Sequence, residues 1–195
     1  MAFWVMHLPL WLLAKCKLYS KEKCRMKWME DLSGIFKGAG EEEVLEVFHW
    51  VAENYIFASL RNDVIEILDG HKQRGDTVVI VSGAFSGLVE IVGQRLGVSN
   101  VIGTKLKVID GKHTGRIIEP MCFGENKVEL LKEFLNRHGL EIDRSSSFAY
   151  ADSIFDASLL KQVDNPVATY PDEDLRRLAE HNHWRMLPDS IERDR

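Results

Sequence analysis

The sequence has few cysteines: Cys16, Cys24 and Cys122 are the only three among its 195 residues. None of them lies in a CxxC pair or in a Cys/His cluster with the spacing of zinc ligands, which argues against a structural zinc knot. Their odd number and wide spacing favour a reduced, cytoplasmic compartment. We expect Cys16 and Cys24 to act as small core or surface residues.

The chain also lacks an excess of positive charge. Its 25 Lys and Arg residues are outnumbered by 30 Asp and Glu residues, which gives a net charge of -5. A general nucleic-acid-binding protein needs an extended basic face, so we expect no nucleic-acid partner. With 45% hydrophobic and 28% charged residues and no internal repeat, the composition is that of one globular domain, with room for a small subdomain.

No apolar run is long enough to cross a membrane. Residues Ala2–Ala14 are apolar apart from His7, but a spanning helix needs about 20 residues. The segment also lacks the positive start and the small-residue cleavage site of a signal peptide. A buried helix and an interfacial helix resting on lipid headgroups both fit this pattern. Basic residues follow the segment: Lys15, Lys17, Lys21, Lys23, Arg25 and Lys27.

Residues 1–70 have a helical pattern with no sign of a strand. Ser20 fits a helix N-cap, and the acidic run Glu41–Glu43 fits the start of another helix, where the backbone dipole favours negative charge. Apolar residues then recur at steps of three and four, which predicts two amphipathic helices. The first stripe is Val44, Val47, Phe48, Val51 and Tyr55, and the second is Val64, Ile65 and Leu68, ending at Gly70.

Residues 71–195 alternate between strand and helix patterns, which predicts an α/β core with a parallel sheet. Thr77–Val81 is a β-branched run typical of a strand buried on both faces, and we expect it to end at Ser82-Gly83. Asp110-Gly111 predicts a small β-hairpin. Further strands are predicted at 101–102, 105–109, 112–117, 147–151 and 166–169, and helices at 88–96, 127–137, 155–163 and 175–181.

Two carboxylates follow the small-residue strand Ala149–Ala151. Ligands bind at the carboxyl ends of strands in such sheets, so we expect Asp152 and Asp156 to lie at the active edge. Carboxylate oxygens there suit Mg²⁺. The alternative is that Asp152 caps the following helix and Asp156 is a solvated residue in its first turn.

Two further positions fit the binding of a phosphate group. Ser82 and Gly83 would offer a hydroxyl and exposed backbone N–H groups in a tight turn, although a simple strand-to-helix turn is as common. Lys127, after Gly124–Asn126, could place an ammonium on a phosphoryl group. Most lysines at helix starts are merely solvated.

Together these segments resemble the haloacid dehalogenase (HAD) superfamily. Val79–Gly83, Gly124–Lys127 and Tyr150–Asp156 resemble its second, third and fourth motifs in order and spacing. Their context resembles the phosphoserine-phosphatase-like branch, subfamily IB, over about residues 8–188. The context residues are Ile102–Leu106, Asp110-Gly111 and Thr114-Gly115.

The resemblance implies a Rossmannoid α/β core at 71–195, a helical cap at 1–70 and a Mg²⁺-dependent phosphomonoesterase acting on a small phosphorylated substrate. In the family an aspartate attacks phosphorus, and a second aspartate two residues later protonates the leaving group. By analogy Ser82 and Gly83 bind phosphate, and Lys127 stabilises the phosphoryl group. Asp152 would ligate Mg²⁺, and Asp156 would support the metal or Lys127.

The first family motif, a strand ending in Asp-x-Asp, is missing from the sequence. The only Asp-x-Asp is Asp172-Glu173-Asp174, which follows Pro171 and begins the predicted last helix. We therefore expect an N-terminally truncated chain whose core lacks its first strand and which is inactive as it stands. The strands that end at Ser82 and Ala151 would then each have an unpaired edge. Ala151, where the family usually has glycine, narrows the backbone approach to the metal.

Three functions agree with these observations. The first is a HAD-type phosphatase that is inactive in this form. The second is a non-catalytic HAD-like module that binds phosphate or a protein partner, and the third is a lipid-phosphate phosphatase acting at a membrane surface. Neither the substrate nor the oligomeric state follows from the sequence.

Overall fold

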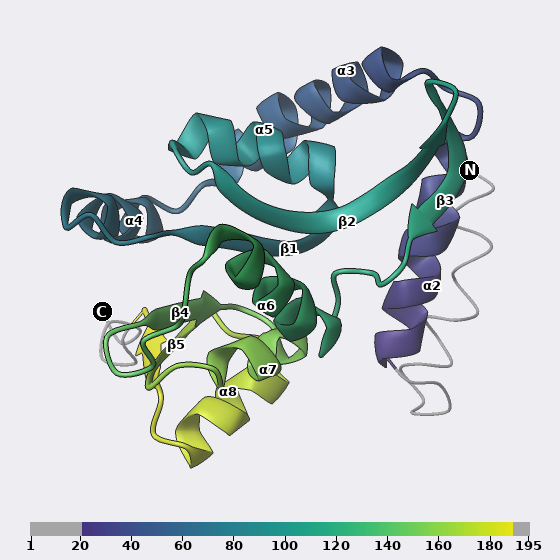
Figure 1. Ribbon diagram of the computed structural model, residues 1–195. Coiled ribbons are helices and arrows are strands. Elements are labelled where there is room, and N and C mark those ends of the chain that lie inside the picture. Colours follow the sequence, from purple (N-terminus) through teal and green to yellow (C-terminus); the bar gives the residue numbers. More distant parts are fainter. Residues whose placement is uncertain (1–20, 189–195) are drawn as a thin grey trace. The chain divides into compact units, whose positions relative to one another are not determined.

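The computed structural model describes residues 21–188. The predicted helix at Ala2–Ala14, the Ser20 cap and Cys16 lie outside the described residues. The chain divides into two compact units, the first ending at Cys122 and the second starting at Phe123. Both units combine helices with parallel strands (Figure 1). The α/β class predicted from the alternating pattern is therefore confirmed.

The first unit contains four α-helices and three strands within its described residues. The segment up to His71 is helical, as predicted, with Glu41–Glu43 forming the first turn of its second helix. Short helical turns join these helices at Gly34–Phe36, Ala52–Ile56 and Phe57–Ser59. The helices are α2 (Lys21–Ser33), α3 (Glu41–Val51), α4 (Asn62–Gln73) and α5 (Ser86–Leu96), and the strands are β1 (Val79–Phe85), β2 (Asn100–Ile109) and β3 (Lys112–Ile118).

Strand β1 runs parallel to β2, and β2 turns back through an antiparallel hairpin into β3. Asp110 and Gly111 both have positive φ at the turn, 50° and 69°, which confirms the predicted hairpin. Strand β2 is one strand of ten residues where two short ones were predicted, because its pairing with β1 resumes at Thr104. Helix α5 packs on β1 and β2, and α3 packs on α5 (Figure 1).

The core of the first unit joins the helical segment to the sheet. Val44 and Phe48 of α3 are buried against Phe85, and Phe36 meets both phenyl rings edge-on. The predicted stripe on α3 was too wide, because the side chain of Tyr55 is 60% exposed and Val47 is also exposed. Helix α4 was predicted to end at Gly70 but continues to Gln73.

The second unit is a small three-stranded parallel sheet with helices. Its strands are ordered β4–β5–β6 and its core is formed by Leu160, Ala168, Leu175 and Ala179. The predicted helix 155–163 is shorter than expected, and β6 was not predicted. The helices are α6 (Asn126–His138), α7 (Ala157–Leu160), a turn at Ile154–Asp156 and α8 (Glu173–His181), and the strands are β4 (Phe148–Ala151), β5 (Asn165–Thr169) and β6 (Arg185–Leu187).

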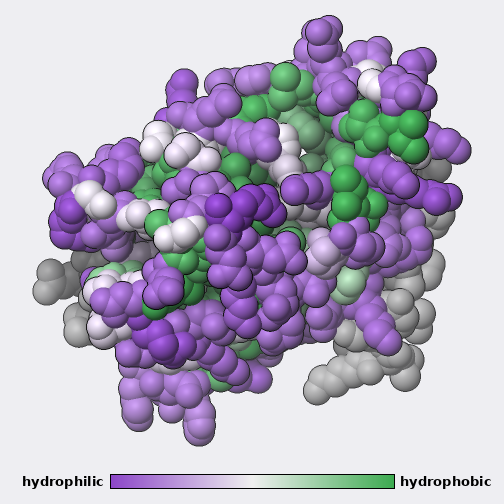
Figure 2. Space-filling view, in the orientation of Figure 1, coloured by the Kyte–Doolittle hydropathy of each residue, from purple (hydrophilic) through white to green (hydrophobic). Residues whose placement is uncertain are grey.

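Strands β1 and β4 are edge strands in the described part of the chain. β1 pairs with β2 and β4 pairs with β5, and neither has a second partner strand among residues 21–188. Figure 2 shows a face of the molecule that is mostly hydrophilic. Hydrophobic side chains gather where Figure 1 draws the β2–β3 hairpin. Ile109 and Ile118 of this hairpin are exposed.

Candidate active site

Lys127 and Asp156 form a buried ion pair in the second unit. Lys127 lies in the first turn of α6, and only 6% of the residue is exposed to solvent. Its ammonium donates a hydrogen bond to Oδ1 of Asp156, at the end of the turn that follows β4. The alternative that Lys127 and Asp156 are merely solvated is wrong, because both side chains are largely buried and paired.

Two further contacts hold the start of α6 to the loop after β4. The hydroxyl of Ser158 donates a hydrogen bond to the carbonyl of Gly124. The rings of Phe123 and Phe155 pack with their centroids 4.9 Å apart. The loops that carry Lys127 and Asp156 are therefore fixed to each other by polar and aromatic contacts as well as by the ion pair.

Asp152 has the opposite environment. It follows β4 directly and is exposed, and its carboxylate makes no hydrogen bond or ion pair with any described residue. The alternative that Asp152 caps a helix is wrong, since the cap of the next turn is Ser153, which makes no capping bond through its side chain. Asp152 is an unengaged carboxylate at the carboxyl end of a parallel strand, where ligands bind in such sheets.

A carboxylate of this kind can hold one corner of a Mg²⁺ site. Mg²⁺ keeps several waters and commonly uses one or two carboxylates together with substrate phosphate oxygens. Residues 21–188 contain no cluster of three or more metal-ligating side chains, so they offer no closed cage. The exposed Asp152 fits an open site, in which Mg²⁺ keeps several waters. Oδ1 of Asp156 is already engaged by Lys127.

Ser82 and Gly83 lie in a bulge of β1, and the prediction that the strand ends at these residues is wrong, because β1 continues to Phe85. Three residues, Ser82 to Ala84, face the single residue Gly103 between two aligned pairs of the β1–β2 ladder. The bulge is closed locally, since the Ala84 N–H donates to the Ser82 hydroxyl oxygen at 3.2 Å. The Ser82 oxygen accepts that bond and keeps its own proton for another acceptor.

Thr104 fixes the bulge from the neighbouring strand. Its fully buried hydroxyl donates to the Gly83 carbonyl at 2.9 Å and accepts from the Cys122 N–H at 3.2 Å. A Cβ on Gly103 would lie 2.8 Å from Cα of Ser86 and 3.0 Å from the Ala84 carbonyl oxygen, so only glycine fits there. Sequence reasoning gave no structural role to Thr104 or Gly103, because the bulge has no signal in the pattern of hydrophobic residues.

The structure thus brings Lys127 and Asp156 into contact, with Asp152 four residues earlier on the same loop. Ser82 and Gly83 belong to the first unit. One residue that sequence reasoning set aside, Asp172, contacts the Asp152 loop in the second unit. The sequence placed it at the start of the last helix, and in the structure it is the N-cap of α8.

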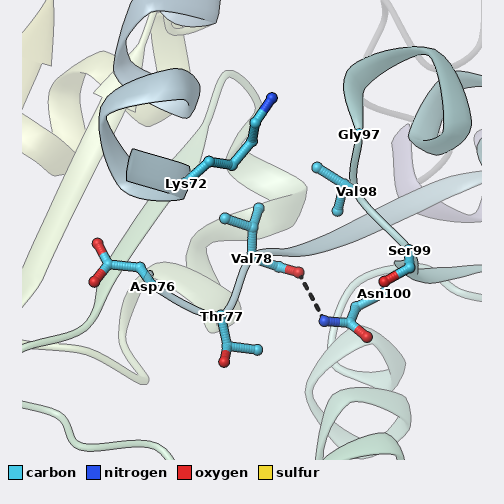
Figure 3. A pocket seen from close by; sticks show the side chains of 8 residues that line it. All are labelled: Lys72, Asp76, Thr77, Val78, Gly97, Val98, Ser99 and Asn100. Atoms are coloured by element: carbon cyan, nitrogen blue, oxygen red, sulfur yellow. Dashed lines mark hydrogen bonds between the residues drawn. The ribbon is translucent and has the colours of Figure 1, made fainter. Parts of the chain in front are cut away.

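The first unit contains a polar cavity at the end of β1 that is opposite to the Ser82 bulge. It has a volume of about 180 Å³ and lies where β1 and β2 begin, lined by Thr77, Val78, Ser99 and Asn100 among others (Figure 3). The Asn100 amide donates to the Val78 carbonyl across it, and Lys72 reaches the Leu96 carbonyl at 3.0 Å. The Ser82 bulge lies toward the opposite, carboxyl end of β1.

Comparison with known proteins decides the family. The family model for haloacid dehalogenase-like hydrolases matches residues 5–161. The chain belongs to this family. The phosphoserine-phosphatase-like character expected from the motifs is also confirmed, because phosphoserine phosphatases occur among its relatives and among solved structures of the same fold.

Three similar proteins illustrate the relationship. An "inhibition of morphological differentiation protein" from Streptomyces azureus is 31% identical over 157 residues, covering 80% of this chain and 56% of that protein. A histidinol-phosphatase from Neisseria meningitidis is 28% identical over 149 residues, covering 75% and 67%. The crystal structure of a Bordetella pertussis protein of unknown function has a TM-score of 0.79 and 26% identity, covering 91% and 78%.

This HAD-family chain spans about half the length of most of the curated relatives it matches. Within residues 21–188, no helix is both long enough and apolar enough to cross a bilayer.

Proposed function

We propose that this chain carries the phosphate- and Mg²⁺-binding part of a HAD phosphomonoesterase acting on small phosphorylated substrates. One observation carries the proposal: the buried Lys127–Asp156 pair lies on the same loop system as Asp152, whose carboxylate is exposed and unengaged. A fixed cation beside an available hard ligand suits the binding of a phosphate dianion together with a divalent metal.

Each residue has a distinct part in this proposal. Asp156 holds the Lys127 ammonium in place, so that the charge faces a bound phosphoryl group without reorganisation. Asp152 would supply one oxygen to Mg²⁺, and the Ser82 hydroxyl, fixed by the Ala84 N–H, would donate a hydrogen bond to a phosphate oxygen. Mg²⁺, when bound, neutralises charge on the phosphoryl oxygens. The small number of cysteines supports a cytoplasmic location.

The relatives suggest where a search for substrates starts. They include a histidinol-phosphatase and phosphoserine phosphatases, so phosphate esters of small amino alcohols form the first group for testing. In this proposal residues 1–70 form the cap that selects among these substrates, and residues 71–195 form the core.

The nucleophile is the part that residues 1–195 do not supply. Their only Asp-x-Asp is Asp172-Glu173-Asp174, and both carboxylate oxygens of Asp172 accept hydrogen bonds from the protein. We therefore propose that these residues alone bind phosphate without hydrolysing its esters.

Fusing a segment that carries the family's Asp-x-Asp motif ahead of residue 1 tests this proposal. Release of phosphate from phosphoserine, histidinol phosphate and p-nitrophenyl phosphate is measured with Mg²⁺. We expect activity in the fusion, and none when its first aspartate is changed to asparagine. A folded fusion without activity on any ester would favour the second candidate, a non-catalytic phosphate-binding module. That candidate is motivated by the missing nucleophile beside an intact Lys127–Asp156 pair.

A further inference from the structure

Asp172 makes more contacts than a helix cap requires. As the N-cap of α8, its Oδ1 accepts a hydrogen bond from the Leu175 N–H at 2.8 Å. This single bond is what an N-cap ordinarily supplies. It accounts for one of the two carboxylate oxygens.

The other oxygen binds the loop that carries Asp152. Oδ2 accepts hydrogen bonds from the Ser153 hydroxyl and from the Ile154 N–H, both at 3.0 Å. In addition, the backbone N–H of Asp172 donates to the carbonyl of Asp152 at 2.7 Å. Asp172 therefore contacts Asp152 and each of the two residues that follow it.

These contacts restrict Asp152 on its C-terminal side. On its N-terminal side, Ala151 is held in the β4–β5 ladder opposite Ala168. The backbone of Asp152 is thus fixed at both ends, while its carboxylate stays exposed and unengaged. Groups that orient a metal ligand in this way affect metal affinity strongly, typically by about 10- to 100-fold.

We infer that Asp172 is a positioning residue, which holds the loop after β4 so that the Asp152 carboxylate points toward the metal. The inference rests on the proposed function, since it assumes that Asp152 is a Mg²⁺ ligand. Asp172 does not itself bind the metal, because both of its oxygens accept hydrogen bonds from the protein.

The matched variants are Asp172→Ser and Asp172→Ala in the full 195-residue chain. Serine is a good N-cap and keeps an oxygen for the Leu175 N–H, but one oxygen on a shorter side chain cannot also reach Ser153 and Ile154. Alanine removes the cap to Leu175 as well as the hydrogen bonds to Ser153 and Ile154. Helix capping and loop positioning are thereby separated.

Calorimetric titration with Mg²⁺ and amide hydrogen exchange provide the two measurements. We expect Asp172→Ser to weaken Mg²⁺ binding about tenfold with a nearly unchanged Tm. Exchange at Ile154 should accelerate while Leu175 stays protected, and Asp172→Ala should accelerate both. The exchange result does not depend on metal, so it reports directly on the loop.

Asp152→Asn distinguishes the possible failures. If the wild type binds Mg²⁺, Asp152→Asn does not, and Asp172→Ser binds like the wild type, the positioning role is overturned while the metal site stands. If the wild type binds no Mg²⁺, or Asp152→Asn binds equally well, the metal assignment falls and the inference falls with it. Fast exchange at Ile154 in the wild type would also overturn the inference.

Discussion

The ammonium of Lys127 donates a hydrogen bond to Asp156, 29 residues later in the chain, and both side chains are largely buried. Removing one partner of a buried pair leaves the other charge without compensation. The pair therefore links stability and the proposed phosphate binding in the same residues.

Replacing Lys127 with methionine should destabilise the protein by about 3 kcal/mol, because the Asp156 carboxylate is left buried and unpaired. Urea unfolding measures the change. The double variant Lys127→Met/Asp156→Asn should recover part of the loss, since it removes the uncompensated charge as well. Equal destabilisation by the single and double variants would show that the two side chains are not coupled.

The motif residues could be located from the sequence because their signals are local. A β-branched run marks the strand that contains Ser82, and small residues with a following carboxylate mark the strand that ends before Asp152. Positive-φ glycines likewise marked the ends of α5 and α6 at Gly97 and Gly139. The Asp110-Gly111 turn was predicted for the same reason.

The contacts that shape the site could not be predicted in this way. The β1 bulge depends on Thr104 and Gly103, about 20 residues further along the chain, and on a register that no local pattern specifies. Asp172 resembled an ordinary N-cap in sequence, because its second oxygen is used only when the loop after β4 folds against it.

Gly103→Ala should destabilise the first unit by about 1–3 kcal/mol, because the new methyl group would collide with the backbone of Ala84 and Ser86. The urea midpoint provides the measurement. Gly34→Ala is the matched control, since nothing lies within 4 Å of a Cβ there. A neutral Gly103→Ala would mean that the bulge is not packed as described.

Asp76 should contribute to stability in a pH-dependent way. The hydrogen bond from His71, assisted by Arg74, lowers the pKa of the Asp76 carboxyl below its usual value. A carboxyl with a lowered pKa stabilises the fold above its unfolded-state pKa, and this contribution disappears as the pH falls through the folded-state value. Asp76→Asn should therefore lower the Tm at neutral pH, and the difference should shrink as the pH falls below the usual range of a carboxyl pKa. A difference that is independent of pH would contradict this assignment.

The 195-residue chain should not hydrolyse p-nitrophenyl phosphate in the presence of Mg²⁺. The only Asp-x-Asp in the sequence is Asp172-Glu173-Asp174. Both carboxylate oxygens of Asp172 accept hydrogen bonds from the protein, so this motif does not supply a nucleophile. Release of p-nitrophenolate is followed alongside Asp152→Asn, which removes an exposed carboxylate with no partner among the described residues and should keep its fold. Turnover that Asp152→Asn abolishes would show that this chain supplies its own nucleophile.

The most direct test of the proposed site is calorimetric titration of inorganic phosphate into the wild-type chain with and without Mg²⁺, with Asp152→Asn as the control. We expect phosphate to bind at millimolar concentrations only when Mg²⁺ is present, and Asp152→Asn to lose this binding while keeping its Tm. Phosphate binding that is equal in both proteins, or absent from the wild type with Mg²⁺, would contradict the assignment of a phosphate and metal site to Lys127 and Asp152.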